Sequence, residues 1–171
     1  NVLCKTCYHF CEDDCIMAGR GVPIAIRHLK QAALQYGNSN LLYVPSKRKE
    51  ERVAIIGGGP TGLMAAWDLA VRGHPVTLYE HEEFVGGQIN TIPRYHLDDE
   101  SLKIDLARWK NLDITWVAGK RAGVDYTPKS LLAEGYEAVL VAIGASKPRE
   151  LNVPGEHLAG VYHALPFLLA M

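Results

Sequence analysis

The stretch Val53-Ala54-Ile55-Ile56-Gly57-Gly58-Gly59-Pro60-Thr61-Gly62 decides the fold of this 171-residue chain. Its first four residues predict a buried strand, and the pattern Gly57-x-Gly59-x-x-Gly62 follows at once and opens a helix. Gly57 allows the tight turn, Gly59 lets backbone amides approach a pyrophosphate, and Gly62 permits close packing of helix on strand. The helix dipole favours the phosphate charge. The stretch therefore predicts a Rossmann-type βαβ unit that binds a dinucleotide; a glycine-rich turn without a ligand is the alternative.

Glu80 ends the second predicted strand, about 20 positions after Gly57. An acid at this distance accepts hydrogen bonds from ribose hydroxyls and disfavours a 2'-phosphate, which indicates FAD or NAD and not NADP. A surface glutamate without function is the alternative. Gly86-Gly87 let the chain pass close to the adenosine half of a long cofactor, and a second glycine-bearing strand end, at residues 141–149, is expected to approach the same pyrophosphate. Together these features favour FAD.

Strand and helix patterns alternate along the rest of the chain, which predicts a parallel sheet. After a cysteine-bearing loop at residues 1–22, a helix is expected to begin at Pro23 and to end at Gly37. Residues 38–51 carry Asn, Ser, Pro and a basic run, which is typical of an exposed connector. Strands are predicted at 53–57, 75–80, 114–117 and 138–143, and helices at 60–73, from Asp98 to about 111, and near 130–133.

The predicted fold class is α/β. An incomplete Rossmann-like FAD-binding domain at residues 52–171 is preceded by a small α-helical, cysteine-rich segment at residues 1–37 and a linker at residues 38–51. A net charge of −1 and a hydrophobic share of 48% give no electrostatic case for nucleic acid. No run approaches the roughly 20 apolar residues of a membrane helix, and no signal pattern opens the chain. We therefore expect a cytoplasmic protein with no nucleic-acid or membrane partner.

All four cysteines fall within residues 4–15, with the spacing C-x2-C-x3-C-x3-C. Four thiolates this close together can converge on one metal centre, whereas scattered cysteines would suggest disulfides. An iron-sulfur cluster is the favoured interpretation, while tetrahedral zinc and disulfide pairing stay open. The predicted metal ligands are Cys4, Cys7, Cys11 and Cys15.

An ordered set of short motifs runs along nearly the whole chain. The motifs are Cys7-x3-Cys11-x3-Cys15, Val22-Pro23-Ile24-Ala25-Ile26-Arg27, the glycine loop, Gly86-Gly87-Gln88, Ile92-Pro93-Arg94-Tyr95, Ala142-Ile143-Gly144-Ala145 and Val153-Pro154-Gly155-Glu156. In this order they resemble the flavin subunit of bacterial glutamate synthase and its relatives. These relatives include the N-terminal part of dihydropyrimidine dehydrogenase and NADH-dependent ferredoxin:NADP oxidoreductases.

The resemblance implies an oxidoreductase in which electrons from NADPH or NADH enter at FAD and pass through [4Fe-4S] clusters, or travel the reverse way. One cluster would be held by Cys7, Cys11 and Cys15. Cys4 would replace a fourth ligand that relatives take from the following helix. His96 stands where relatives often have an arginine. The implied cofactor-binding residues are Gly57, Gly59, Pro60, Thr61, Gly62, Glu80, His81, Gly86, Gly87, Gln88, His96, Ala142, Ile143 and Gly144.

In relatives an NAD(P)H-binding domain follows the segment like Val161–Met171, and the flavin domain is completed after it. This chain starts at Asn1 without a methionine and stops in an apolar run, so we expect an excised piece that holds FAD weakly and is inactive alone. Its expected partners are the rest of its own polypeptide or a catalytic subunit. Two alternatives are an NAD-dependent dehydrogenase domain, which Gly86-Gly87 argue against, and a non-catalytic docking module whose cysteine loop binds zinc.

Overall fold

A computed structural model describes residues 1–37 and 45–170 of the chain. The chain forms two compact units. The first unit comprises Asn1–Tyr43 and Pro93–Asn111, and the second unit comprises Val44–Ile92 and Leu112–Met171. Pro93–Asn111 therefore groups with the N-terminal residues, whereas the sequence placed this stretch in the FAD-binding domain. The predicted division into segment, linker and FAD-binding domain stays a prediction.

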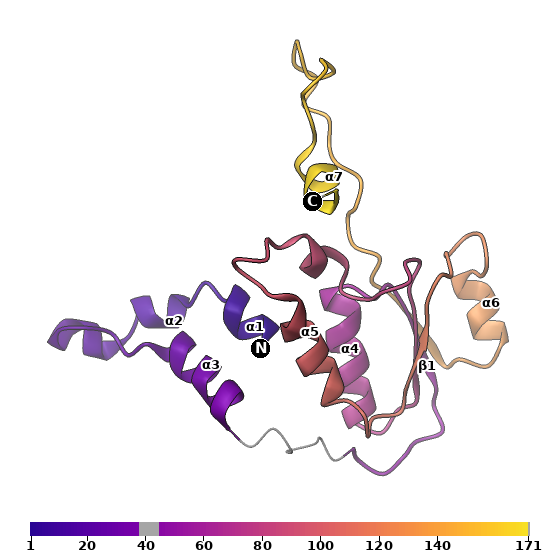
Figure 1. Ribbon diagram of the computed structural model, residues 1–171. Helices are drawn as coiled ribbons and strands as arrows, with labels where there is room; N and C mark the ends of the chain where they lie inside the picture. The colour runs from indigo at the N-terminus through magenta and orange to yellow at the C-terminus, as the bar shows by residue number, and fades with distance from the viewer. Residues whose placement is uncertain (38–44, 171) are drawn as a thin grey trace. The chain divides into compact units, whose positions relative to one another are not determined.

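The second unit contains a four-stranded, fully parallel sheet in the order β3-β2-β1-β4. Its strands are β1 (Val53–Ile56), β2 (Val76–Tyr79), β3 (Ile114–Val117) and β4 (Ala138–Val141), and β1 is labelled in Figure 1. The register pairs Ile56 with Tyr79 on one side and with Val141 on the other. The predicted parallel α/β fold is confirmed, with the strand ends trimmed by one or two residues.

The strand order creates a switch point at the carboxyl ends of β1 and β4. From β1 the chain moves outward through β2 to β3, and it then returns to place β4 on the opposite side of β1. In open parallel sheets, ligands bind outside the carboxyl ends of the strands at the point where the order reverses. The residues that follow Ile56 and Val141 therefore lie where a ligand is expected.

Helix α4 (Pro60–Val71) covers one face of the sheet and begins directly after β1, as predicted. Its sheet-facing residues Leu63, Ala66 and Ala70 are buried. Because alanine side chains are small, the helix packs close to the strands. This close packing also holds the loop at the N-terminus of the helix against the carboxyl end of the sheet. The helix ends at Val71, two residues earlier than predicted, and Gly73 then turns the chain with a φ of +92°.

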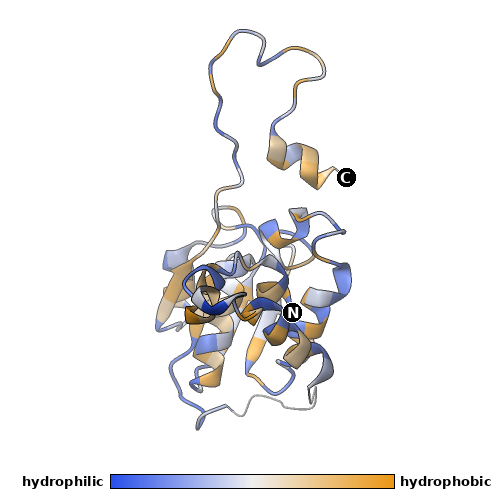
Figure 2. Cartoon of the chain, turned by 90° about the vertical axis from the view of Figure 1, so that its left-hand side faces the viewer, coloured by the Kyte–Doolittle hydropathy of each residue, from blue (hydrophilic) through white to orange (hydrophobic). Residues whose placement is uncertain are grey.

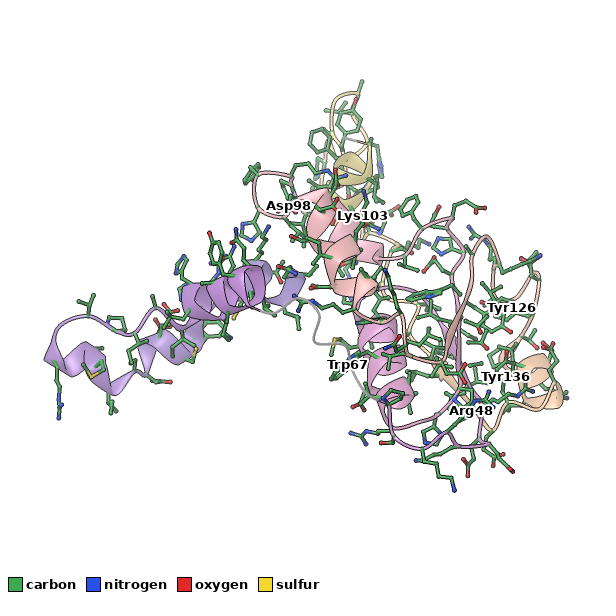
Figure 3. The ribbon with its side chains drawn as sticks, turned by 60° about the horizontal axis from the view of Figure 1, so that its bottom comes forward. Arg48, Trp67, Asp98, Lys103, Tyr126 and Tyr136 are labelled. Atoms are coloured by element: carbon green, nitrogen blue, oxygen red, sulfur yellow. The ribbon has the colours of Figure 1, made fainter. Side chains whose placement is uncertain are left out.

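The opposite face is sealed by a cluster in which Ala54 and Ile56 pack with Leu131 and Tyr136. Leu131 belongs to α6 (Pro128–Ala133), which begins with a reciprocal capping box between Thr127 and Ser130. Tyr126 and Tyr136 lie beside this helix in Figure 3. The Tyr136 hydroxyl donates to Thr77 Oγ1 at 2.9 Å, so the polar end of this buried ring has a partner.

The first unit is built from short helical pieces. They are α1 (Val2–Thr6), α2 (Phe10–Asp13), the 3₁₀ turn η1 (Ile16–Arg20), α3 (Ile26–Tyr36) and α5 (Asp99–Ala107). The prediction of a loop at residues 1–22 was wrong, because these residues form two short α-helices and a 3₁₀ turn. The helix predicted from Pro23 begins at Ile26, since the Ile26 N–H bonds back to Ile24 O at 2.8 Å before the helical pattern starts. Asp98 caps α5 as predicted, although α5 ends at Ala107.

The connector predicted at 38–51 lies partly outside the described residues. Its described part, residues 45–51, is largely exposed and is tied to the end of α4. The Ser46 N–H donates to Val71 O and the Lys49 N–H to Gly73 O, both at 2.8 Å. These hydrogen bonds hold the segment that leads into β1 against the end of α4. Residues 45–51 are therefore not a free linker.

Two further elements of the second unit were not predicted from the sequence. The 3₁₀ turn η2 (Gly87–Thr91) forms within a stretch expected to be irregular, and α7 (Ala164–Leu169) forms in the apolar run near the end of the chain. Figure 2 shows α7 as mostly hydrophobic, and α7 packs against η2. Across the described part of the chain, every helix is too short or too polar to cross a bilayer.

Candidate functional site

The glycine loop occupies the switch point, and Gly57 makes the turn there. Gly57 has a φ of +110°, a value that favours glycine. Its N–H donates to Tyr79 O at 2.8 Å, which ties the loop to β2. A Cβ added at Gly57 would lie 2.3 Å from Ala142 O, so the turn also runs tightly against the chain leaving β4. Only glycine satisfies both the torsion and this close approach.

Gly62 and Gly59 serve different purposes in the same loop. A Cβ at Gly62 would lie 1.8 Å from Gly57 O, because the first turn of α4 sits directly on the loop. A Cβ at Gly59 would meet nothing within 4 Å, and Gly59 is the N-cap of α4. The space beside Gly59 is therefore open at the positive end of a helix dipole, next to Pro60 and Thr61, which suits an anion such as pyrophosphate.

A second glycine pair closes over the first loop. The Gly86 N–H donates to Gly58 O at 2.8 Å, and a Cβ at Gly87 would lie 2.9 Å from Gly59 Cα. Gln88 reaches across from η2 to Ala145 O at 3.5 Å. Both glycines have positive φ values, and a side chain on Gly87 would collide with the loop backbone. The absence of side chains on Gly86 and Gly87 thus allows this backbone segment to contact the glycine loop at the switch point.

The carboxylate of Glu80 is buried at the end of β2, with 6% of the residue exposed. Its Oε2 accepts a hydrogen bond from the Gly58 N–H at 2.6 Å, and its Oε1 accepts one from the Glu82 N–H at 3.0 Å. His81 Nδ1 lies 2.6 Å from the same Oε1. A buried charge needs such partners, so the Glu80 side chain has a defined position beside the glycine loop.

The structure brings most of the predicted cofactor residues together in the second unit. Ala142, Ile143 and Gly144 leave β4 beside Gly57, and the Ala142 N–H donates to Ile56 O at 2.8 Å. Ile143 is largely exposed, and Gly144 turns with a φ of +68°. His96 is exposed and belongs to the first unit, so its predicted contact with the cofactor stays a prediction.

Gly58 is a residue of the site that the sequence patterns did not single out. Its amide holds the Glu80 carboxylate, and a Cβ there would lie 3.0 Å from both Glu80 Oε2 and Val85 Cγ1. The available signal was the middle glycine of the Gly57-Gly58-Gly59 run, because the dinucleotide pattern leaves that position free.

The four cysteines lie on separate turns of the first unit. Cys4 is buried in α1, Cys7 ends that helix, Cys11 is exposed in α2, and Cys15 precedes η1; all four are free thiols. Within residues 1–37 and 45–170, no group of three or more His, Cys, Asp or Glu residues is arranged to hold a metal ion. The structure therefore does not show the predicted convergence of the thiolates, and the cluster stays a prediction.

Backbone N–H groups contact two of these sulfurs. The His9 backbone N–H donates to Cys7 Sγ at 3.3 Å. Backbone hydrogen bonds, first from Ile24 and then from Met17, lower the pKa of the Cys15 thiol from its usual value. Because the thiolate is the form that binds metals, these bonds favour the ligating state of Cys15, and the donor chemistry of the four thiols fits an iron-sulfur or zinc centre.

The chain is similar to known proteins in one part of its sequence by family and along nearly its whole length by individual relatives. Residues 55–108 match the family described as NAD(P)-binding Rossmann-like domain. The chain is 30% identical over 168 residues to the glutamate synthase [NADPH] small chain of Mycobacterium tuberculosis, across 96% of this chain and 34% of that protein. The resemblance inferred from the motifs is confirmed.

Two further similarities agree with this relationship to the glutamate synthase small chain. The chain is 35% identical over 162 residues to the NAD-dependent dihydropyrimidine dehydrogenase subunit PreT of Escherichia coli O157:H7, across 93% of this chain and 39% of that protein. The solved structure of Mycobacterium tuberculosis FprA in complex with NADPH superposes with a TM-score of 0.60 at 26% identity, covering 70% of this chain and 28% of that chain. The chain thus spans 34% of the length of the glutamate synthase small chain and 39% of the length of the PreT subunit.

Proposed function

We propose that this chain binds FAD and an iron-sulfur cluster as part of an oxidoreductase that exchanges electrons with NAD(P)H. One observation carries the proposal. The glycine loop, the Glu80 carboxylate, the Gly86-Gly87 pair and the end of β4 meet at the single switch point of a parallel sheet. The names of the relatives, which include NADPH and NAD, support the nicotinamide partner.

Each part of this site has a separate task in binding FAD. The amides at the start of α4, around Gly59 and Thr61, would hold the pyrophosphate. Glu80 would accept a ribose hydroxyl, while Gly87 and Ala142 bring backbone close to the cofactor without side chains in the way. When bound, the flavin supplies the redox chemistry, and the protein supplies position and exclusion of water.

We assign the cluster to Cys4, Cys7, Cys11 and Cys15. Four thiolates match the ligand set of a [4Fe-4S] centre, and the lowered pKa of Cys15 supports the ionised form of that thiol. The cytoplasm, as a reducing compartment, would keep these thiols available. The partner that completes the activity would be the rest of the same polypeptide or a separate catalytic subunit.

Anaerobic purification of the protein as its host makes it, with the flanking sequence it carries there, tests the proposal. Released flavin, iron and acid-labile sulfide are measured on the same sample. We expect FAD together with iron and sulfide in near-equal amounts. Zinc without flavin would instead establish the docking module, and a nicotinamide dinucleotide without flavin would establish a simple dehydrogenase domain.

A further inference from the structure

His81 follows Glu80 and stands between two carboxylates. Its Nδ1 lies 2.6 Å from Glu80 Oε1, and its Nε2 lies 3.1 Å from Glu82 Oε1. Both ring nitrogens thus lie within ion-pair distance of a carboxylate oxygen. The ring is about half exposed, whereas the Glu80 side chain is 7% exposed. His81 therefore reaches from the surface to one oxygen of a buried acid.

The polar contacts of Glu80 divide unequally between its two oxygens. An ionised carboxylate offers about four lone-pair positions, two on each oxygen. In the described part of the chain, Oε1 accepts the Glu82 N–H and lies 2.6 Å from His81 Nδ1, while Oε2 accepts the Gly58 N–H. The ring therefore occupies the space at Oε1, and Oε2 keeps one open position. The Gly58 bond places that oxygen on the side of the glycine loop.

We infer that His81 is a positioning residue, which occupies Oε1 of Glu80 and so presents Oε2 to a hydroxyl of the adenosine ribose. This role rests on the FAD site proposed above. It differs from the role that the resemblance implied, in which His81 would touch the cofactor itself. Without the imidazole, Oε1 loses its contact with the ring, and only the two backbone N–H groups hold the carboxylate in place.

A matched pair of variants tests this role in the full protein. Asn places its amide nitrogen about where the imidazole has Nδ1, so His81→Asn keeps a donor to Glu80. Leu has nearly the shape of Asn and no donor. Both variants lose the Glu82 contact, so they differ from each other only in the donor to Glu80. Thermal unfolding of both variants checks that the fold is retained, which the exposed position of His81 favours.

Affinity for FAD is then compared with affinity for an FAD analogue whose adenosine ribose lacks both hydroxyls. We expect His81→Leu to weaken FAD binding about tenfold, as for the loss of one hydrogen bond to a charged group. We expect His81→Asn to bind within about twofold of the wild type. The analogue should bind wild type and both variants alike, because it has no hydroxyl for Oε2.

Three results would overturn the inference, and they are distinguishable. If FAD binds His81→Leu as tightly as wild type, His81 does not position Glu80. If His81→Leu weakens the analogue as much as FAD, the residue has a general structural role. If the wild-type protein binds no FAD, the proposed function fails and the role of His81 fails with it.

Discussion

Glycine is required in the loop for different reasons at two neighbouring positions. At Gly62 a methyl group would collide with the Gly57 carbonyl, whereas at Gly59 it would project into open space. We predict that Gly62→Ala lowers the free energy of unfolding by about 1–3 kcal/mol, the range for overpacking a close contact. Gly59→Ala should cost less stability than Gly62→Ala, since its φ of −77° suits alanine and only an N-cap preference is lost, but it should abolish tight FAD binding.

Urea unfolding and FAD titration of the two variants measure these effects side by side. Wild-type stability in Gly62→Ala would contradict the packing described here. Wild-type FAD affinity in Gly59→Ala would mean that the pyrophosphate lies elsewhere.

At the scale of single residues, the sequence predicted where a residue lies along the backbone better than it predicted which residues its side chain contacts. Spacing was enough to place Glu80 at the end of a strand beside the loop. It could not show that Gly58 and His81 share the carboxylate, because such contacts depend on how a turn folds back in space. The pattern rule reserves positions for three glycines, so it is silent about the one that binds Glu80.

Helix α5 begins at the N-cap residue Asp98, whose side chain also forms an ion pair. Asp98 accepts hydrogen bonds from Lys5 Nζ and from the hydroxyl and N–H of Ser101, and these bonds lower the pKa of Asp98 to about 2, with Lys5 the largest cause and the Ser101 hydroxyl next. A carboxyl whose pKa falls on folding stabilises the protein above its unfolded value of about 4. We predict that this contribution is lost as the pH falls from about 4 to about 2.

The Asp98→Asn variant isolates the charge, because asparagine caps a helix as well as aspartate does. Stability measured by denaturant between these pH values should fall less steeply in the variant than in wild type. Equal slopes would show that Asp98 titrates alike in the folded and unfolded chains. Lys5→Met should raise the pKa of Asp98, which an NMR titration of the carboxyl carbon would detect.

At the scale of elements, long patterns were predictable and short ones were not. The strands and α4 carry apolar runs that only one kind of element fits, and their predicted positions hold. Helices such as α1 and α2 have four or five residues, too few for a helical period to be visible. Pro23 indicated a helix start, yet the chain first makes a tight turn at Ile24.

At the scale of the whole molecule, the two proposed cofactors depend on different units. The cysteines belong to the first unit and the glycine loop to the second. We predict that Cys15→Ser loses iron and keeps FAD, and that Gly59→Ala loses FAD and keeps iron. Iron and flavin analysis of both purified variants measures this. Loss of both cofactors in either variant would contradict independent sites.

The edge of the sheet explains why the chain alone should bind FAD weakly. β4 is an outer strand, and Leu140, Val141 and Ile143 at its end are exposed. Exposed apolar residues on an edge strand leave the site-forming loop after β4 poorly supported. We predict that residues 1–171 bind FAD weakly, as a fluorescence titration would show. Tight stoichiometric binding by residues 1–171 would contradict this.

The central claim is that the loop from Gly57 to Gly62 holds FAD, and a structure of the protein with its cofactor tests it most directly. We predict the pyrophosphate against the amides at the start of α4 and the adenosine ribose against Glu80 Oε2. A nicotinamide dinucleotide in this loop, or a flavin bound away from β1 and β4, would contradict the claim.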